Sequence, residues 1–528
     1  MKIFNTAGPV NPEYHYTIDP LRRISLEDIE LLIEQHKYFV LHAPRQTGKT
    51  SCLLALMEHI NNGAKYRALY VNVEPAQAAR EDVKRGIKSV LSSIASQSVH
   101  FLNDSFVHDN FNKIIEQNGE DNALNEILTQ WSAHNTKPII LMIDEIDALI
   151  GDTLISVLRQ IRAGYTKRPN LFPQTIILCG VRDIRDYRIH SSKDKEIITG
   201  GSAFNVKAKS LRLGDFIKSE VYALLGEHTK ETGQKFEIKA EELIWEYTQG
   251  QPWLVNALAY ETCFETKEKR DKIVKREPVT EEMVKDAKEN LILRRETHLD
   301  QLADKLREER VRRVIEPIIT GKMLTSAIPE DDVQYLTDLG LIRRKPSVEI
   351  SNPIYMEIIP RMLTSTTQDT ITQQSSWYIN PDGHLEIKKL ILSFQEFFRE
   401  HSEHWIERFQ YKEAGPQLLL QAFLQRIVNG GGRVEREYGL GRMRTDLLII
   451  WKHSSGVQKV VIELKILYKS LEQTIREGLS QTLAYMDRCG TDDGNLLIFD
   501  RIKDKSWEEK IFYKEEQIEE KIIKVFGM

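Results

Sequence analysis

The sequence predicts an α/β fold built on a parallel sheet, because short apolar runs alternate with amphipathic stretches over the first third of the chain. Helical patterns at Thr50–Ile60 and from about residue 81 to 130 supply the long crossovers that parallel strands require. The apolar runs are continuous rather than alternating, which is typical of strands covered on both faces. These predicted strands are Lys37–His42, Ala68–Val73, Pro138–Ile143 and Gln174–Cys179.

Length and composition indicate a multidomain protein without a strong global charge. The chain has 528 residues, and roughly 150 residues per domain predicts three or four domains. With a net charge of -5, it does not attract nucleic acid through its overall field, so any such contact needs a local basic patch. The four cysteines, Cys52, Cys179, Cys263 and Cys489, include no C-x-x-C pair, which argues against a disulfide framework or a zinc ribbon.

The chain shows no targeting or membrane signal. Its first residues lack a long apolar core and a small-residue cleavage site, so we expect no secretory signal peptide. No apolar run approaches the roughly 20 residues that a membrane helix needs. We therefore expect a cytoplasmic protein with no membrane partner.

A glycine-containing loop lies between the first predicted strand and the first predicted helix. Phosphate-binding loops have this position, because backbone N–H groups and the helix N-terminus together hold phosphates. Lys49 is expected to reach the β- and γ-phosphates and the Thr50 hydroxyl to bind Mg²⁺. The loop departs from the usual pattern at its first position, where Ala43 replaces glycine, and a methyl group is tolerated there unless φ is positive. The expected phosphate contacts are Ala43, Pro44, Arg45, Gln46, Thr47, Gly48, Lys49 and Thr50.

An acidic pair ends the third predicted strand. Asp144 and Glu145 follow five apolar residues, and such a strand end is expected beside the phosphate loop. Asp144 would then hold the Mg²⁺ shell, and Glu145 would activate the attacking water. The alternative is that the pair only caps a helix. Finding both motifs in this order favours the nucleotide site.

The rest of the chain divides by pattern into further predicted domains. Helical periodicity from about residue 211 to 291 is interrupted at Gly250-Gln251-Pro252, and a helix–strand–strand–helix order around residues 333–363 resembles a winged helix. The polar tract Thr364–Ser376 is predicted to be a linker. The predicted domains are an N-terminal segment near the nucleotide site (1–28), the core (29–210), a helical lid (211–295), a winged helix (296–364), a linker (365–384) and a C-terminal domain (385–528).

The stretches HAPRQTGKTS, LMIDEIDALIGD, RQIRAGY, LCGVRDIRDY and GQPWLVN resemble AAA-type ATPases of the AAA+/STAND superfamily. The resemblance implies ATP and Mg²⁺ as cofactors and a homo-oligomer formed through the ATPase domain. It implies that Arg182 senses the γ-phosphate, although Cys179-Gly180 replaces the usual polar strand end, and that Pro252 packs near the adenine. Arg162 is either an arginine finger or a solvated helix residue, and Tyr14 and Tyr16 either line the base pocket or only pack.

A second set of charged residues lies near the C-terminus. Asp446 begins one apolar run, and Glu463 and Lys465 lie in the next, VVIELKI. With Ser455-Gly456 as a two-residue turn, antiparallel pairing places Leu448 opposite Glu463 and Asp446 opposite Lys465. The three charged residues then share one face, within reach of one metal ion. An E-x-K triplet alone is more often a solvated ion pair, but charges in a buried strand favour a functional role.

This D…E-x-K pattern resembles the PD-(D/E)XK nuclease superfamily. The resemblance implies that Asp446 and Glu463 bind Mg²⁺ and that Lys465 positions the attacking water. It also implies supporting roles for Gln481 and Tyr485, which share a helical face, and a further acidic ligand at Glu413.

The sequence therefore predicts an α/β protein: a P-loop parallel-sheet ATPase core with helical lid and winged helix, followed by an α/β restriction-endonuclease-like domain. The first hypothesis is an ATPase whose nucleotide state controls a Mg²⁺-dependent endonuclease with DNA as partner, a combination that fits defence against foreign DNA. The alternative is a non-nucleolytic ATP switch or scaffold whose C-terminal domain serves recognition or assembly.

Overall fold

The structure is a computed structural model of the 528-residue chain. It forms two compact units, Met1–Leu291 with Gln334–Ile342, and Ile292–Val333 with Arg343–Met528. The residues that the structure describes are 1–183, 188–190, 197–199, 204–294, 305–306, 308–319, 328–344, 347–363, 378–408, 420, 423–424, 432–437, 446–453, 456–467, 470–500, 502 and 505–528.

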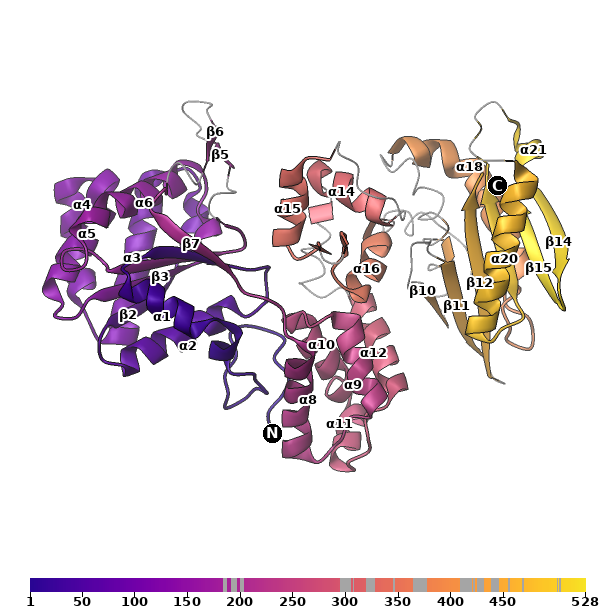
Figure 1. Cartoon of the computed structure of the whole chain (residues 1–528), viewed down its shortest axis with the longest axis horizontal. Coiled ribbons are helices and arrows are strands. Elements are labelled where there is room, and N and C mark those ends of the chain that lie inside the picture. Colours follow the sequence, from indigo (N-terminus) through magenta and orange to yellow (C-terminus); the bar gives the residue numbers. More distant parts are fainter. Residues whose placement is uncertain are drawn as a thin grey trace. The chain divides into compact units, whose positions relative to one another are not determined.

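A five-stranded parallel sheet is the centre of the first unit (Figure 1). Its order is β2-β3-β4-β1-β7, with every neighbouring pair parallel. The four predicted strands are present, and β7 is a fifth that the apolar pattern missed, because an edge strand of sequence KAKSLR carries mostly polar side chains. The bounds are β1 Tyr38–His42, β2 Arg67–Asn72, β3 Ile139–Asp144, β4 Thr175–Gly180 and β7 Lys207–Arg212; a separate ribbon pairs β5 Arg188–His190 with β6 Ile197–Thr199.

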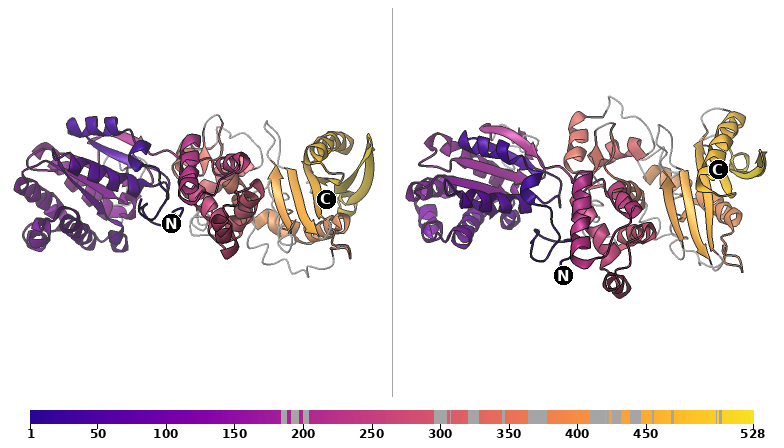
Figure 2. Two further views of the ribbon diagram at one scale, coloured as in Figure 1. Left: turned by 90° about the horizontal axis from the view of Figure 1, so that it is seen from below. Right: turned by 60° about the horizontal axis from the view of Figure 1, so that its bottom comes forward.

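Helices cover both faces of this sheet, as the continuous apolar strands require (Figure 2). Side chains of α1 and α2 pack with those of β1–β4 in one buried cluster, and α3–α6 form the other cluster on the opposite face. Alternate residues of each strand enter the two clusters: Phe39 and Leu41 face α1 and α2, whereas Tyr38 and Val40 face α3–α6. The helices are α1 Leu26–Glu34, α2 Lys49–Asn62, α3 Val83–Leu102, α4 Phe106–Asn118, α5 Glu120–His134 and α6 Gly151–Ala163.

A bundle of short helices follows β7, as the helical periodicity predicts. Gly250 lies at φ +79°, and a Cβ there would come 2.0 Å from the carbonyl oxygen of Phe216, so only glycine allows this close approach. Pro252 then occupies the first turn of α10, where its missing N–H has no helical partner to lose. The helices are α8 Lys218–Thr232, α9 Ile238–Thr248, α10 Pro252–Cys263, α11 Lys267–Val274 and α12 Glu281–Arg294.

The predicted winged-helix segment contains the expected order of elements. These are α14 Glu309–Ile319, α15 Glu330–Asp338, β8 Ile342–Arg343, β9 Glu349–Ile350 and α16 Pro353–Leu363. The compact units do not follow the predicted boundaries, because residues 334–342 belong to the first unit and the flanking residues to the second. The winged-helix domain therefore remains a prediction.

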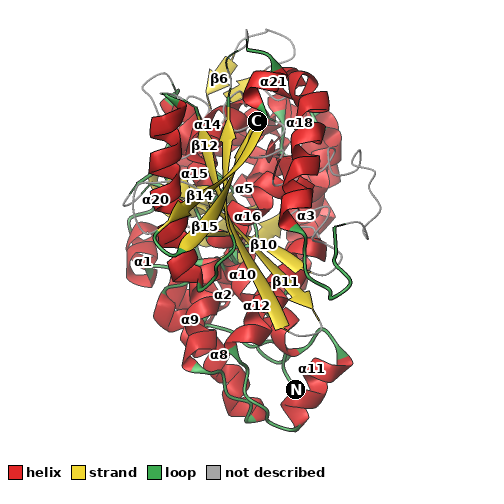
Figure 3. Cartoon of the chain, turned by 90° about the vertical axis from the view of Figure 1, so that its right-hand side faces the viewer, coloured by secondary structure: helices red, strands yellow, loops and turns green. Residues whose placement is uncertain are grey.

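A six-stranded mixed sheet with a helix on each face forms the C-terminal domain (Figure 3). Tyr378 is buried in the cluster on the α18 face, so this packing begins within the predicted linker rather than after residue 384. The sheet order is β10-β11-β12-β13-β15-β14. The bounds are α18 Ile387–Arg408, β10 Gly432–Glu437, β11 Asp446–His453, β12 Gly456–Ile466, α20 Leu471–Cys489, β13 Gly494–Phe499, α21 Trp507–Lys510, β14 Phe512–Ile518 and β15 Lys521–Gly527.

The β11–β12 register differs from the prediction by two residues. Leu448 pairs with Val461 instead of Glu463, and His453 pairs with Gly456. Glu463 lies directly beyond the Leu447–Ile462 pair, at the level of Asp446 rather than opposite Leu448. Glu463 and Lys465 share a face in either register, because they lie two residues apart in β12.

No helix in the described part of the chain is long and apolar enough to span a membrane.

Candidate functional site

The loop between β1 and α2 has the backbone of a tight turn that opens a helix. Gln46 and Gly48 have positive φ values of 57° and 88°, whereas Ala43 is not among the residues with positive φ, so its methyl group causes no strain. Gly48 is the N-cap of α2, which begins at Lys49. The Lys49 ammonium is buried and donates to the carbonyl oxygens of Ala43 and Pro44 at 3.1 and 3.0 Å. The loop thus places a cation and the first N–H groups of a helix together.

The acidic pair meets this loop even though β4 separates β3 from β1. The Thr50 hydroxyl donates to Asp144 Oδ2 at 2.8 Å, and the Tyr70 hydroxyl donates to the same oxygen at 3.0 Å. The backbone N–H of Glu145 donates to Asp144 Oδ1 at 2.9 Å. Asp144 is fully buried and makes no ion pair with a lysine or arginine among the described residues. A buried carboxylate held only by neutral donors fits a site that receives a cation.

Glu145 has the strained backbone often found at reactive positions. It adopts the left-handed conformation at φ 56°, which is uncommon for a residue with a side chain. Burial raises the pKa of its carboxyl group above the ordinary value, and the neighbouring Asp147 raises it further. A carboxylate with a raised pKa is a stronger proton acceptor than an exposed glutamate.

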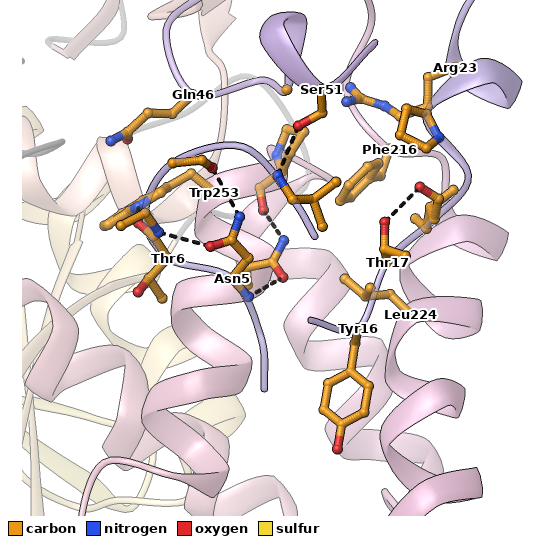
Figure 4. A pocket seen from close by; sticks show the side chains of 18 residues that line it. Asn5, Thr6, Tyr16, Thr17, Arg23, Gln46, Ser51, Phe216, Leu224 and Trp253 are labelled. Atoms are coloured by element: carbon orange, nitrogen blue, oxygen red, sulfur yellow. Dashed lines mark hydrogen bonds between the residues drawn. The ribbon is translucent and has the colours of Figure 1, made fainter. Parts of the chain in front are cut away.

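A cavity of about 130 Å³ opens beside the loop, within the first compact unit (Figure 4). Gln46, Gly48 and Ser51 contribute its loop side, and Pro252 and Trp253 its helical side. Most of the remaining wall comes from the N-terminal segment, which is attached to both sides. Its attachments are three hydrogen bonds: Val10 N–H to Ser51 Oγ (3.0 Å), Trp253 Nε1–H to the Thr6 carbonyl (2.9 Å) and Asn5 N–H to Asn256 Oδ1 (3.2 Å).

Of the two tyrosines considered for this pocket, only one lines it. Tyr16 is buried, contacts the cavity and packs edge-on against His228, whereas Tyr14 is exposed and is not part of the lining. Pro252 lies in the lining of the cavity, and its expected contact with the adenine stays a prediction.

Arg23 links the loop between β1 and α2 to the segment between β7 and α8. Its guanidinium donates to the carbonyl oxygens of Thr47 and Gly214, the latter at 2.6 Å, and lies over the Phe216 ring at 4.7 Å. Carbonyl oxygens and an aromatic face are the partners that a planar guanidinium prefers. Arg23 therefore holds a loop residue and the start of the helical bundle in one arrangement.

Arg182 does not line the cavity. It forms an ion pair with Asp338 at 3.5 Å, and its guanidinium lies 4.9 Å from the Tyr335 ring, both within the segment that joins the first unit. The γ-phosphate role of Arg182 stays a prediction. The other arginine considered, Arg162, is exposed in the last turn of α6.

His42 is a buried ionisable group at the end of β1, directly before the loop to α2. It is 8% exposed, and its Nδ1 has no hydrogen-bond partner among the described residues. Burial lowers its pKa to about 4, with Arg212, Lys207 and Lys49 opposing its protonation and Asp183 favouring it. In the unfolded chain this pKa is about 6.5.

We therefore expect His42 to destabilise the fold in acid. The folded state binds fewer protons than the unfolded state between pH 6.5 and 4, so stability is full above this window and falls as the pH decreases. Between pH 7.5 and 5 the loss attributable to His42 is about 2 kcal/mol. Urea unfolding at both pH values should show that His42→Gln loses about 2 kcal/mol less than wild type, while the exposed His108→Gln follows wild type. Equal losses in all three proteins would contradict this assignment.

The C-terminal charged residues form a buried cluster on the α20 face of the mixed sheet. The Lys465 ammonium contacts Glu463 Oε1 at 2.5 Å and also donates to Gln481 Oε1 on α20. Glu463 and Lys465 are 1% and 3% exposed. Tyr485 is buried on the same helix, within the apolar cluster that α20 makes with the sheet. Three predicted residues, Glu463, Lys465 and Gln481, are thus in direct contact.

The other two predicted metal ligands are not tested. Asp446 begins β11, paired with Glu437, but its side chain is outside the described residues. Glu413 lies wholly outside them. In the part of the chain that is described, no group of three or more His, Cys, Asp or Glu side chains has the arrangement of a metal site.

No sequence motif marked Tyr70 or Arg23. Tyr70 and Asn72 carry the polar groups of the run ALYVNV, and this is only a weak signal. Arg23 precedes the first strand in a segment without periodicity, and no local pattern pointed to it.

Comparisons with solved structures reveal distant similarities over the N-terminal two thirds. The Walker-type ATPase paby2304 of Pyrococcus abyssi shares 16% identity over 67% of this chain and 99% of its own, with a TM-score of 0.45. Cdc6p from Pyrobaculum aerophilum shares 13% identity over 69% of this chain and 98% of its own, with a TM-score of 0.37. Domain III of the Thermotoga maritima replication initiation protein DnaA shares 14% identity over 54% of this chain and 99% of its own, with a TM-score of 0.33. No family model matches the sequence, and no curated protein does. At these identities and TM-scores, the site geometry alone carries the functional assignment.

Proposed function

We propose that this chain binds and hydrolyses ATP at the loop Ala43–Thr50. The observation that carries the proposal is the 2.8 Å hydrogen bond between Thr50 and Asp144, which joins two motifs recognised independently in the sequence. The Lys49 ammonium would bind phosphate oxygens, and the cavity beside Gly48 and Pro252 would receive the base. Glu145 would accept the proton of the attacking water.

The residues at the strand end fit a magnesium ion. The Thr50 hydroxyl and the Asp144 carboxylate are oxygen donors, which Mg²⁺ prefers, and Asp144 is a buried carboxylate without a described cationic partner. When bound, Mg²⁺ neutralises charge on the phosphate oxygens during transfer.

Replacing Lys49 tests this proposal directly. Lys49→Ala removes the buried ammonium, and the loss of its charge-assisted hydrogen bonds should weaken ATP binding by about 10- to 100-fold. Isothermal titration calorimetry of wild type and variant with ATP and Mg²⁺ measures the change, with the exposed Lys65→Ala as the control. Wild-type affinity in Lys49→Ala would show that the loop does not hold phosphates.

We propose in addition that the C-terminal domain cleaves DNA with Mg²⁺ and that the nucleotide state controls this cleavage. The supporting observation is the buried contact of Lys465 with Glu463 and Gln481. A buried ion pair contributes little net stability compared with apolar side chains, so its presence favours a role in chemistry. Glu463 and Asp446 would hold the metal ion, and Lys465 would orient the attacking water. If the domain cleaves nothing, it is a recognition or assembly module of an ATP-dependent switch.

A further inference from the structure

Tyr70 contacts the carboxylate that the nucleotide site uses, although it lies in a different strand. It belongs to β2, two residues before Asn72, which pairs with Asp144. The side chains of Tyr70 and Asp144 both point to the α1–α2 face. Tyr70 lies in the buried cluster on that side, and so does Met142, which is two residues before Asp144 in β3. The Tyr70 hydroxyl thereby reaches Asp144 Oδ2 at 3.0 Å.

Three described hydrogen bonds hold the Asp144 carboxylate, and each comes from a different place in the fold. Thr50 on α2 and Tyr70 on β2 donate to Oδ2, and the Glu145 N–H donates to Oδ1. Thr50 is itself expected to bind the metal ion. Tyr70 is therefore the hydroxyl that can hold Oδ2 in place while Thr50 serves as a ligand.

The surroundings of Tyr70 make its hydroxyl well defined. The side chain is 6% exposed, and its ring packs edge-on against Phe101 with centroids 6.2 Å apart. A packed ring keeps the hydroxyl in one position, so the hydrogen bond needs little further ordering. In a buried site such a bond to a carboxylate is stronger than in water.

We propose that Tyr70 is a positioning residue for Mg²⁺ binding: its hydroxyl orients the Asp144 carboxylate toward the metal ion that accompanies ATP. This inference rests on the proposed ATP site and goes beyond it. It assigns a role in Mg²⁺-dependent ATP binding to a residue that belongs neither to the loop Ala43–Thr50 nor to the acidic strand end. Tyr70 touches neither the nucleotide nor the reacting atoms in this proposal.

The test measures how strongly Mg²⁺ tightens ATP binding. Isothermal titration calorimetry of the full chain with ATP, in Mg²⁺ and in EDTA, gives the ratio of the two dissociation constants. Tyr70→Phe keeps the buried ring and removes only the hydroxyl. We expect the Mg²⁺-dependent ratio to fall by about 3- to 10-fold, as loss of one hydrogen bond predicts, while affinity in EDTA is unchanged.

Tyr38→Phe is a matched control for the structural effect of losing a buried hydroxyl. Tyr38 is fully buried in β1 of the same sheet, faces the opposite side, and donates to the Pro173 carbonyl at 3.2 Å. Both variants should show similar small changes in thermal unfolding, and only Tyr70→Phe should change the ratio.

Two results would overturn the inference. One is a ratio in Tyr70→Phe equal to that of wild type, which would make the hydroxyl merely structural. The other is a wild-type protein that binds ATP equally well in Mg²⁺ and EDTA. A wild-type chain that binds no ATP under either condition is a separate outcome, because it would overturn the proposed function itself.

Discussion

Replacing Glu145 by Gln should slow ATP hydrolysis by about 100- to 1,000-fold, as expected for loss of a general base. The amide has the shape of the carboxylate but cannot accept a proton from water. ATP binding should stay within about threefold of wild type, because Lys49 and the loop backbone hold the phosphates. Phosphate release at saturating ATP and Mg²⁺ gives the rate, and calorimetry gives the affinity.

Glu58→Gln is the control for this variant, since Glu58 is an exposed glutamate on α2 and is absent from the cavity lining. It should hydrolyse ATP like wild type. If Glu145→Gln instead keeps a rate within about threefold of wild type, then Glu145 is not the base and its left-handed backbone only shapes the turn after β3.

The second large effect is expected at Glu463. Glu463→Gln should reduce Mg²⁺-dependent DNA cleavage by at least about 100-fold, because it removes one of the two proposed metal-binding carboxylates and the partner of Lys465. Nicking of supercoiled plasmid and degradation of linear DNA, each with and without ATP, measure the activity. The exposed Glu472→Gln on α20 should cleave like wild type.

Loss of folding must be separated from loss of chemistry in this variant. Removing one partner of a buried pair leaves Lys465 without its counter-charge and costs about 3 kcal/mol. The double variant Glu463→Gln/Lys465→Met removes both charges and should recover most of that stability while remaining inactive. If wild type nicks DNA no faster than Glu463→Gln, the C-terminal domain is a recognition module and not a nuclease.

The proposed nucleotide site shows which features can be predicted from neighbouring residues alone. The loop Ala43–Thr50 and the acidic strand end were predicted from the sequence, because each depends on neighbouring residues: a strand, a turn and a helix start. The contact between Thr50 and Asp144 depends on the order of strands, which no local pattern encodes. The same is true of Tyr70, whose role exists only because β2 lies beside β3.

The C-terminal cluster is a second case in which local sequence patterns and tertiary contacts can be compared. Lys465 contacts both Glu463 and Gln481, although the β11–β12 register differs from the prediction by two residues. The register does not affect these contacts, because Glu463 and Lys465 lie two residues apart in the same strand and Gln481 comes from α20.

By itself, the sequence determined the parallel α/β core, the turn that opens α2, the acidic strand end and the charged strand near the C-terminus. These follow from apolar periodicity and from short motifs, in which the interacting groups are close in the chain. Only the tertiary structure decided the polar edge strand β7, the cavity wall formed by the N-terminal segment and the positions of Arg23 and Tyr70. Each of these depends on packing between distant segments, and such packing is determined by the whole fold rather than by the residues nearby.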